Sequence, residues 1–93
     1  MNEVLVRAIE VFGEDIQHDI AVEEMAELTK EIIKWKRNKL NGNELASEIA
    51  DVEIMLEQLK IMHDNHKQVE IWKKMKLERL VTRIECRKNE LPY

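Results

Sequence analysis

Residues 15–63 decide the fold and read DIQHDIAVEEMAELTKEIIKWKRNKLNGNELASEIADVEIMLEQLKIMH. Apolar residues recur in this stretch at steps of three and four, which is the period of an amphipathic helix. Asn41-Gly42-Asn43 interrupts the pattern and is the clearest break in the chain. The stretch therefore predicts two helices, residues 15–39 and 44–63, joined by a short turn that allows them to pack antiparallel.

Both expected helices have an apolar stripe and a residue suited to capping the N-terminus. Asp15 and Asn43 are the expected caps. The expected inward residues are Ile16, Ile20, Met25, Leu28, Ile32 and Trp35 in the first helix, and Leu45, Ile49, Val52, Leu56 and Leu59 in the second. A small bundle cannot cover the further apolar residues off these stripes, so we expect self-association. Those residues are Val22, Ile33, Ile54, Met55 and Ile61.

The flanking sequence adds one expected helix on each side, residues 2–12 and 67–88. Two Gly, one Pro and 37% charged residues, with helix formers throughout, indicate an all-α protein. At 93 residues, we expect a single domain, 1–93, with a four-helix bundle-like fold. Pro92 marks the end of helical structure. The expected buried side of the last helix is Val69, Trp72, Met75, Leu80 and Ile84.

Composition excludes several classes of function. A net charge of −4 argues against a general nucleic-acid binder. No apolar run approaches the roughly 18 residues needed to span a bilayer, and the N-terminus lacks the pattern of a signal peptide. The single Cys86 cannot form an intrachain disulfide, and a free thiol is typical of a reducing cytoplasm. We expect Cys86 to be an ordinary helical residue and the protein to be cytoplasmic, without a membrane or nucleic-acid partner.

Two pairs of acidic residues suggest the chemistry. Glu24 and Glu27 lie three apart, as do Glu48 and Asp51, so each pair shares a helix face. Acidic helix faces are usually solvated, but these acids lie beside the apolar stripes, where unpaired charge is costly. Across an antiparallel pair of helices the four carboxylates can converge, and an all-oxygen site suits Mg²⁺ or Mn²⁺.

The same residues match a family motif. Glu23-Glu24-x-x-Glu27 followed by Glu48-x-x-Asp51 resembles the Glu-Glu-x-x-Glu … Glu-x-x-Asp motif of MazG-like nucleoside triphosphate pyrophosphohydrolases, of the all-α NTP pyrophosphatase superfamily. The flanking text, EEMAEL from residue 23 and EIADVEIML from residue 48, is similar to that of small MazG-like proteins. The resemblance covers most of residues 15–85.

The resemblance implies a specific reaction. MazG-like enzymes cleave between the α- and β-phosphates of a nucleoside triphosphate, release a monophosphate and pyrophosphate, and use Mg²⁺ held by the motif acids. By position, Glu24, Glu27, Glu48 and Asp51 are the expected metal ligands, and Glu23 supports that shell or orients the attacking water. The resemblance also implies a homo-oligomer, either a dimer or a tetramer.

Substrate contacts are expected on the last helix and near the first pair of acids. Lys76 and Arg79 match a Lys-Asn…Arg pattern of many relatives, although Leu77 replaces the Asn; a solvated basic face is the alternative. Trp35 either stacks on a nucleobase or belongs to the core or an interface, and Gln17 is a candidate for reading a base edge. No Glu-x-x-His pair exists, which argues against a di-iron bundle.

Two functions from different classes remain open. The first is a Mg²⁺-dependent nucleoside triphosphate pyrophosphohydrolase, for which Mn²⁺ could replace Mg²⁺. The sequence does not identify the preferred base or sugar, and an enzyme of the same fold that prefers dUTP or another specific nucleotide is a variant of this hypothesis. The alternative is a non-catalytic helical interaction or regulatory module of the same fold, in which the acids are structural. The retention of all five motif acids favours the enzyme.

Overall fold

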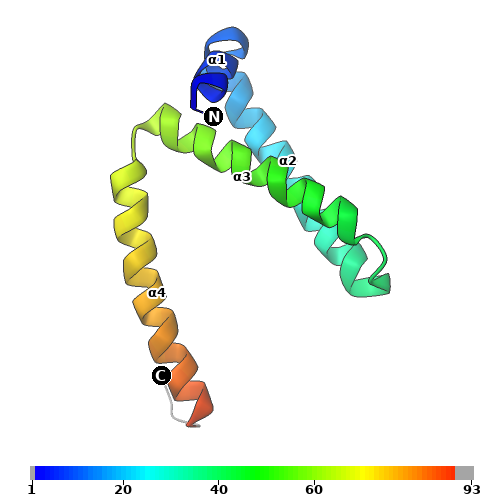
Figure 1. Cartoon of the computed structure of the whole chain (residues 1–93), viewed down its shortest axis with the longest axis vertical. Helices are drawn as coiled ribbons and strands as arrows, with labels where there is room; N and C mark the ends of the chain where they lie inside the picture. Colours follow the sequence, from blue (N-terminus) through cyan, green and yellow to red (C-terminus); the bar gives the residue numbers. More distant parts are fainter. Residues whose placement is uncertain (1, 90–93) are drawn as a thin grey trace.

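The computed structural model describes residues 2–89, which form four helices and, within that range, no strand. They are α1 (Asn2–Phe12), α2 (Glu14–Asn38), α3 (Gly42–His63) and α4 (His66–Lys88) (Figure 1). The predicted all-α class is confirmed, and every predicted boundary lies within two residues of the observed one. Pro92, the predicted end of helical structure, lies outside the described residues.

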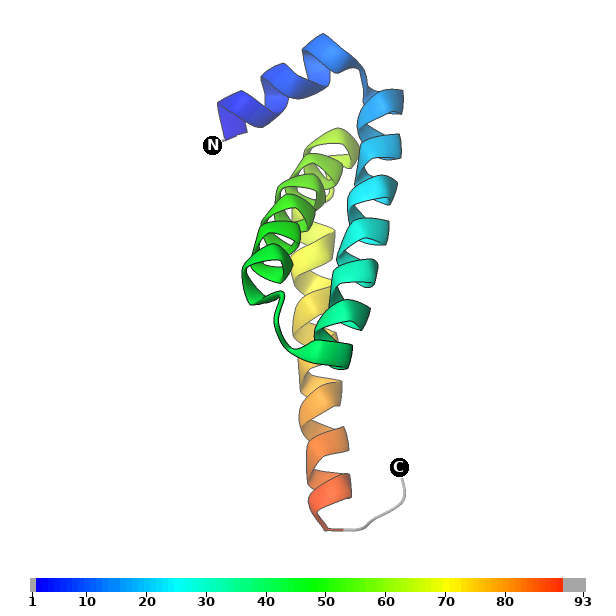
Figure 2. The same cartoon turned by 90° about the vertical axis from the view of Figure 1, so that its right-hand side faces the viewer.

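Gly13 separates α1 from α2 and allows the chain to change direction sharply there (Figure 2). Its φ of 93° lies in a region that side chains disfavour, so glycine is needed at this position. The Gly13 N–H donates to the Ile9 carbonyl, and the Gly13 carbonyl accepts from the Gln17 N–H. Gly13 is therefore the N-cap of α2, and the prediction of Asp15 as the cap was wrong. Asp15 lies instead in the first turn, where the helix dipole favours its charge.

α2 and α3 form the predicted antiparallel hairpin, which is the main packing interaction of the chain (Figure 2). Lys39 is the C-cap of α2, and its N–H donates to the Trp35 carbonyl at 2.8 Å from a left-handed conformation (φ 61°). Asn41, rather than the predicted Asn43, occupies the N-cap position of α3. Its side chain makes no capping bond, because its amide instead donates back to α2, to the Glu31 carbonyl and carboxylate.

The contact between Asn41 and Glu31 fixes the turn against α2. The Asn41 Nδ2–Glu31 Oε2 distance is 2.6 Å, and Lys34 lies 3.3 Å from the other carboxylate oxygen. These donors, Asn41 first, lower the pKa of Glu31 although desolvation opposes them. A carboxylate with a lowered pKa stabilises the fold above its ordinary pKa, and this stabilisation is lost as the pH falls through the lowered value.

Asn41→Asp should turn the stabilising contact between residue 41 and Glu31 into a destabilising one. The change keeps the shape but replaces the amide donor with a second carboxylate against Glu31, so the melting temperature at neutral pH should fall. The loss should shrink as the pH is lowered, because protonation removes the repulsion. Asn43→Asp is the control, since Asn43 is exposed at the start of α3 and should tolerate an acid. Equal melting temperatures for the two variants at neutral pH would contradict the role of Asn41.

The seam between α2 and α3 is more polar than the sequence predicts. Its most buried apolar residues are Ala21, Val52 and Met55, while Gln17 and Gln58 are equally buried. Met55, predicted to lie off the stripe, is therefore in the core. The inward face of each helix is rotated relative to the predicted stripe, so several residues predicted to face inward are exposed: Ile16, Met25, Ile32, Trp35, Ile49 and Leu56. Acidic residues occupy the seam positions between them, with Glu24 on α2 and Glu48 on α3 half-buried.

α1 and α4 differ in how many of the other helices they contact. α1 lies across the end of the hairpin, contacts both α2 and α3, and buries Leu5. α4 contacts α3 alone and swings away from the hairpin (Figure 1). The radius of gyration is 17.1 Å, against about 12 Å for a compact domain of this length. The predicted burial of Trp72, Met75, Leu80 and Ile84 was therefore wrong within one chain, which does not close a four-helix bundle.

Histidine side chains connect α3 to both α2 and α4. His18 in the second turn of α2 and His63 at the end of α3 approach within 2.8 Å through their Nε2 atoms. His66 at the start of α4 lies 2.6 Å from a carboxylate oxygen of Glu57 on α3.

Across the described residues, no helix combines the length and apolar character needed to cross a membrane.

Candidate metal centre

Three carboxylates converge at the seam between α2 and α3. Glu24 comes from α2, and Glu48 and Asp51 come from successive turns of α3, where their three-residue spacing puts them on one face. Each offers an oxygen that lies within 4.8 Å of an oxygen of the other two, and all three side chains are half-buried. We call Glu24, Glu48 and Asp51 the acidic cluster. The prediction that the two motif halves meet across an antiparallel pair is confirmed for these three residues.

Glu48 has the least satisfied position in the acidic cluster. Its Oε2 is buried, and no hydrogen-bond donor among the described residues reaches it. A buried polar atom without a partner costs about 1–3 kcal/mol, and more where the group is charged. A cation at this position would compensate the unpartnered carboxylate oxygen.

The protonation of Glu24 reflects the same crowding. Desolvation is the largest cause raising its pKa, followed by the charge of Asp51 and a hydrogen bond in which protonated Glu24 donates to Asp51. The charges of Glu48 and Glu27 raise the pKa of Glu24 further. Without a cation, the crowding therefore makes ionisation of Glu24 less favourable than that of a free carboxyl group.

The donor set fits a hard divalent cation. Three carboxylates and no nitrogen or sulfur ligand suit Mg²⁺ or Mn²⁺, which prefer oxygen. Mg²⁺ usually keeps several waters and binds through one or two carboxylates together with substrate phosphates. The acidic cluster is half-buried rather than enclosed, so positions remain for water and for phosphate oxygens.

Glu24→Gln should change how stability depends on pH in metal-free protein. Because the folded-state pKa of Glu24 is raised, wild-type stability should decrease as the pH rises from about 4.5, the ordinary value, through the raised value. Above the raised value the loss is complete. The glutamine side chain of the variant does not titrate, so the variant should not lose stability in this way. In EDTA, the unfolding free energy of the variant minus that of the wild type should therefore increase with pH over that interval. A difference that stays constant with pH would contradict the crowded environment of Glu24.

The structure leaves two motif acids outside the acidic cluster. Glu27 lies one turn along α2 from Glu24, but its side chain is 52% exposed and lies 4.0 Å from Lys30. It is near enough to raise the pKa of Glu24 through its charge. Glu23 is exposed on α2. The roles of Glu27 and Glu23 both stay predictions, and Glu27 can join the cluster by a side-chain rotation.

The predicted substrate residues are not gathered at the acidic cluster. Lys76 and Arg79 are exposed on α4, and Lys76 lies about 15 Å along that helix from its start. Trp35 is about 16 Å along α2 from Glu24, and Lys39 lies 3.9 Å from the centre of its ring, on one face. Gln17 is only 3% exposed, which argues against its reading a base edge.

Glu31 is a buried acid of α2 that the sequence pattern did not single out. It continues the face of Glu24 and Glu27 along α2 and is more buried than either, which the same spacing argument could have indicated. Its bonds to Asn41 and Lys34 satisfy it, so its role is structural.

Comparison with protein-family models, with curated proteins and with solved structures finds no match to this chain.

Proposed function

We propose that this protein is a Mg²⁺-dependent nucleoside triphosphate pyrophosphohydrolase that cleaves between the α- and β-phosphates and releases a monophosphate and pyrophosphate. The observation that supports this most is the acidic cluster with its buried, unpartnered Glu48 oxygen, formed by residues at motif positions. Mn²⁺ is the natural substitute for Mg²⁺. We place the protein in the cytoplasm, because the free thiol of Cys86 is typical of a reducing compartment.

Each acid has a distinct role in this proposal. Glu24, Glu48 and Asp51 hold the cation, and Glu27 completes the set by turning from Lys30 toward the cluster. Bound Mg²⁺ neutralises charge on the triphosphate and lowers the pKa of a coordinated water. Glu23, which is exposed on α2, would support the metal ligands or orient the attacking water. The half-buried seam fixes the carboxylates in position, so the protein contributes positioning and electrostatic stabilisation rather than covalent chemistry.

The proposed enzyme is a homo-oligomer, a dimer or a tetramer. Within one chain α4 contacts α3 alone, and its large apolar side chains are exposed. Lys76 and Arg79 therefore contact substrate only when assembly brings an α4 helix to an acidic cluster. The base and sugar of the substrate stay open.

Metal and product analysis tests the reaction. Turnover of nucleoside triphosphates should require Mg²⁺ or Mn²⁺ and stop in excess EDTA, and phosphorus NMR should show a monophosphate and pyrophosphate. Diphosphate with orthophosphate would mean that another bond is cleaved, and full turnover in EDTA would exclude the metal. A panel of ordinary and modified triphosphates, scored by pyrophosphate release, would identify the preferred substrate.

The exposed apolar surface of α4 also favours the alternative function, a non-catalytic interaction module. The two functions differ in the role of the acids. In the enzyme, Mg²⁺ raises the melting temperature by binding the acidic cluster, and the effect is lost in Glu48→Gln. In the module, Mg²⁺ has the same small effect on the wild type and on the variant, and no triphosphate is cleaved.

A further inference from the structure

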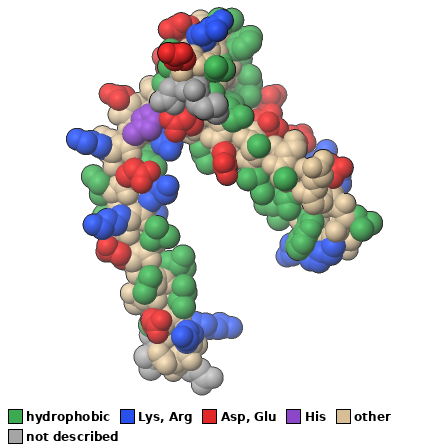
Figure 3. Space-filling view, in the orientation of Figure 1, with side chains coloured by type: hydrophobic (Ala, Val, Ile, Leu, Met, Phe, Trp, Pro, Cys, Tyr) green, Lys and Arg blue, Asp and Glu red, His purple; other side chains and the backbone are tan. Residues whose placement is uncertain are grey.

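α4 carries an apolar stripe that nothing else in the described chain covers. Four residues of this stripe follow the i, i+3, i+4, i+7 pattern of a helix that docks into a groove, and each is about half exposed: Leu77, Leu80, Val81 and Ile84. Figure 3 shows hydrophobic side chains along α4 between Lys and Arg residues. Such surface on a helix of 23 residues requires a partner, because packing supplies most of the stability of a helix in water.

Charge is divided unequally between α4 and the remainder of the molecule. Residues 66–88 contain eight Lys and Arg against three Glu, a net charge of +5. Residues 2–63, which form α1, α2 and α3, contain seven Lys and Arg against fourteen Asp and Glu, a net charge of −7. We call residues 2–63 the acidic body. The chain therefore carries two surfaces of opposite charge, and among the described residues of a single copy α4 contacts the acidic body only through α3.

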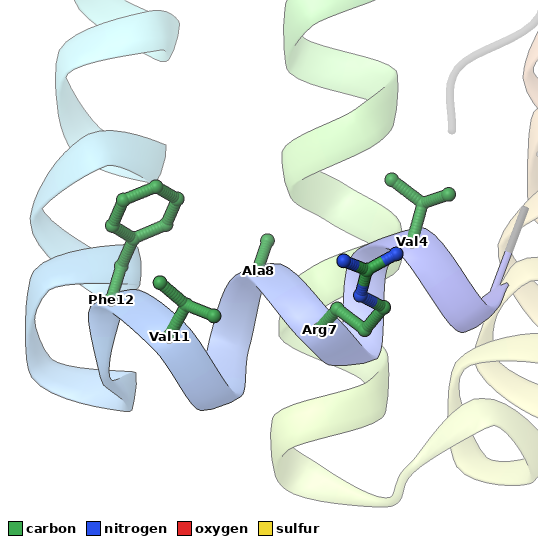
Figure 4. Close-up of a pocket in the computed structure, with 5 residues that line it drawn as sticks. All are labelled: Val4, Arg7, Ala8, Val11 and Phe12. Atoms are coloured by element: carbon green, nitrogen blue, oxygen red, sulfur yellow. The ribbon is translucent and has the colours of Figure 1, made fainter.

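The acidic body also has apolar surface that a helix can cover. Met25, Ile32 and Ile33 are exposed on α2, and Ile49 and Ile54 are exposed on α3. On α1, a shallow cavity of about 300 Å³ is lined by Val4, Arg7, Ala8, Val11 and Phe12, on one face of the helix (Figure 4). A second cavity of about 490 Å³ lies at the corner between α3 and α4, lined by Leu56 and Leu59 of the acidic body and by Val69 of the same chain's α4.

We propose that α4 of one copy packs on the acidic body of a second copy, and that the second copy returns its own α4 in the same way. Pairing α4 with α4 would bring two helices of charge +5 together, and pairing two acidic bodies would bring together two surfaces of charge −7. Reciprocal exchange instead matches opposite charges at both contacts and closes with two-fold symmetry. This defines the contacts in the proposed homo-oligomer, and it does not depend on the hydrolase activity.

Site-directed photo-crosslinking locates the residues that α4 touches. Lys88→Cys in a Cys86→Ser background gives one thiol at the exposed end of α4 for a benzophenone maleimide. The labelled protein is mixed with unlabelled ¹⁵N-enriched Cys86→Ser protein, so that crosslinks between copies carry both isotopes. We expect mixed-isotope crosslinks from the label to peptides within residues 2–63. Mixed crosslinks to residues 66–89, crosslinks within one copy alone, or a monomeric mass by light scattering would each overturn the proposal.

Charge reversal tests the same contact without a label or a nucleotide. Lys73→Glu with Lys74→Glu should weaken association by about tenfold or more at low salt, as expected when opposite charges at an interface become like charges. The matched control, Lys36→Glu with Arg37→Glu at the end of α2, makes the acidic body more acidic and should not weaken association. Sedimentation velocity across a dilution series measures both. Equal weakening by both variants, or no change in either, would contradict docking of α4 on the acidic body.

Discussion

Glu48→Gln should remove turnover while raising the melting temperature of the metal-free protein. The change keeps the volume of the side chain and removes one negative charge from the acidic cluster. Turnover should fall by roughly 100-fold or more, because a bound metal supplies several kcal/mol of transition-state stabilisation. The metal-free fold should gain on the order of 1 kcal/mol, because the variant no longer buries a charged oxygen that lacks a partner.

Both properties should be measured on the same variant, with pyrophosphate release assayed in Mg²⁺ and melting measured in EDTA. Glu53→Gln is the matched control, because Glu53 lies on α3 two residues after Asp51 and is exposed. It should leave both properties close to the wild type. Lower stability of Glu48→Gln with activity retained in the folded fraction would identify Glu48 as a structural residue and remove it from the site.

Met55→Ala should destabilise the protein far more than Met75→Ala in dilute solution. Met55 is 5% exposed in the seam, whereas Met75 is 53% exposed on α4, so the same truncation samples two environments. Removing a buried methionine side chain costs about 2–5 kcal/mol, a large share of the stability of a small domain. Removing an exposed one costs little, unless a second copy covers it.

Chemical denaturation at several protein concentrations separates these effects. The cost of Met55→Ala should be large at every concentration. The cost of Met75→Ala should increase with concentration, because the proposed assembly would bury α4. A Met75→Ala cost that is large and independent of concentration would mean that α4 packs within its own chain. A small cost for Met55→Ala would mean that the α2–α3 seam does not hold the fold together.

The hairpin of α2 and α3 could be predicted from the sequence because its signals are local. Three- and four-residue apolar steps and the Asn41-Gly42-Asn43 break identify the helices and the turn. The face that each helix turns inward could not be predicted, because apolar residues occupy more than one face. Met55 and Gln58 are buried where the sequence pattern favoured Ile49 and Leu56. The choice depends on how the two helices meet, which is a tertiary effect.

The candidate site could be predicted to a similar extent. Glu24, Glu48 and Asp51 meet because a three-residue step and an antiparallel pair constrain them geometrically. Glu27 has the same spacing from Glu24, yet its side chain lies beside Lys30, a choice between rotamers that spacing cannot decide. Lys76 and Arg79 depend on where α4 goes after Asp64, whose left-handed conformation (φ 48°) ends α3. Where Lys76 and Arg79 lie relative to the acidic cluster therefore depends on the direction of α4, which residue spacing does not determine.

The uncovered surface of α4 has a consequence for the lifetime of this protein in a cell. A chain that remains alone leaves α4 without tertiary support, and helices of this kind open readily and are accessible to proteases. In the proposed assembly, a second copy would cover the helix and protect it. Newly made protein should therefore be degraded quickly at low abundance and slowly at high abundance, so that its lifetime depends on its own expression level.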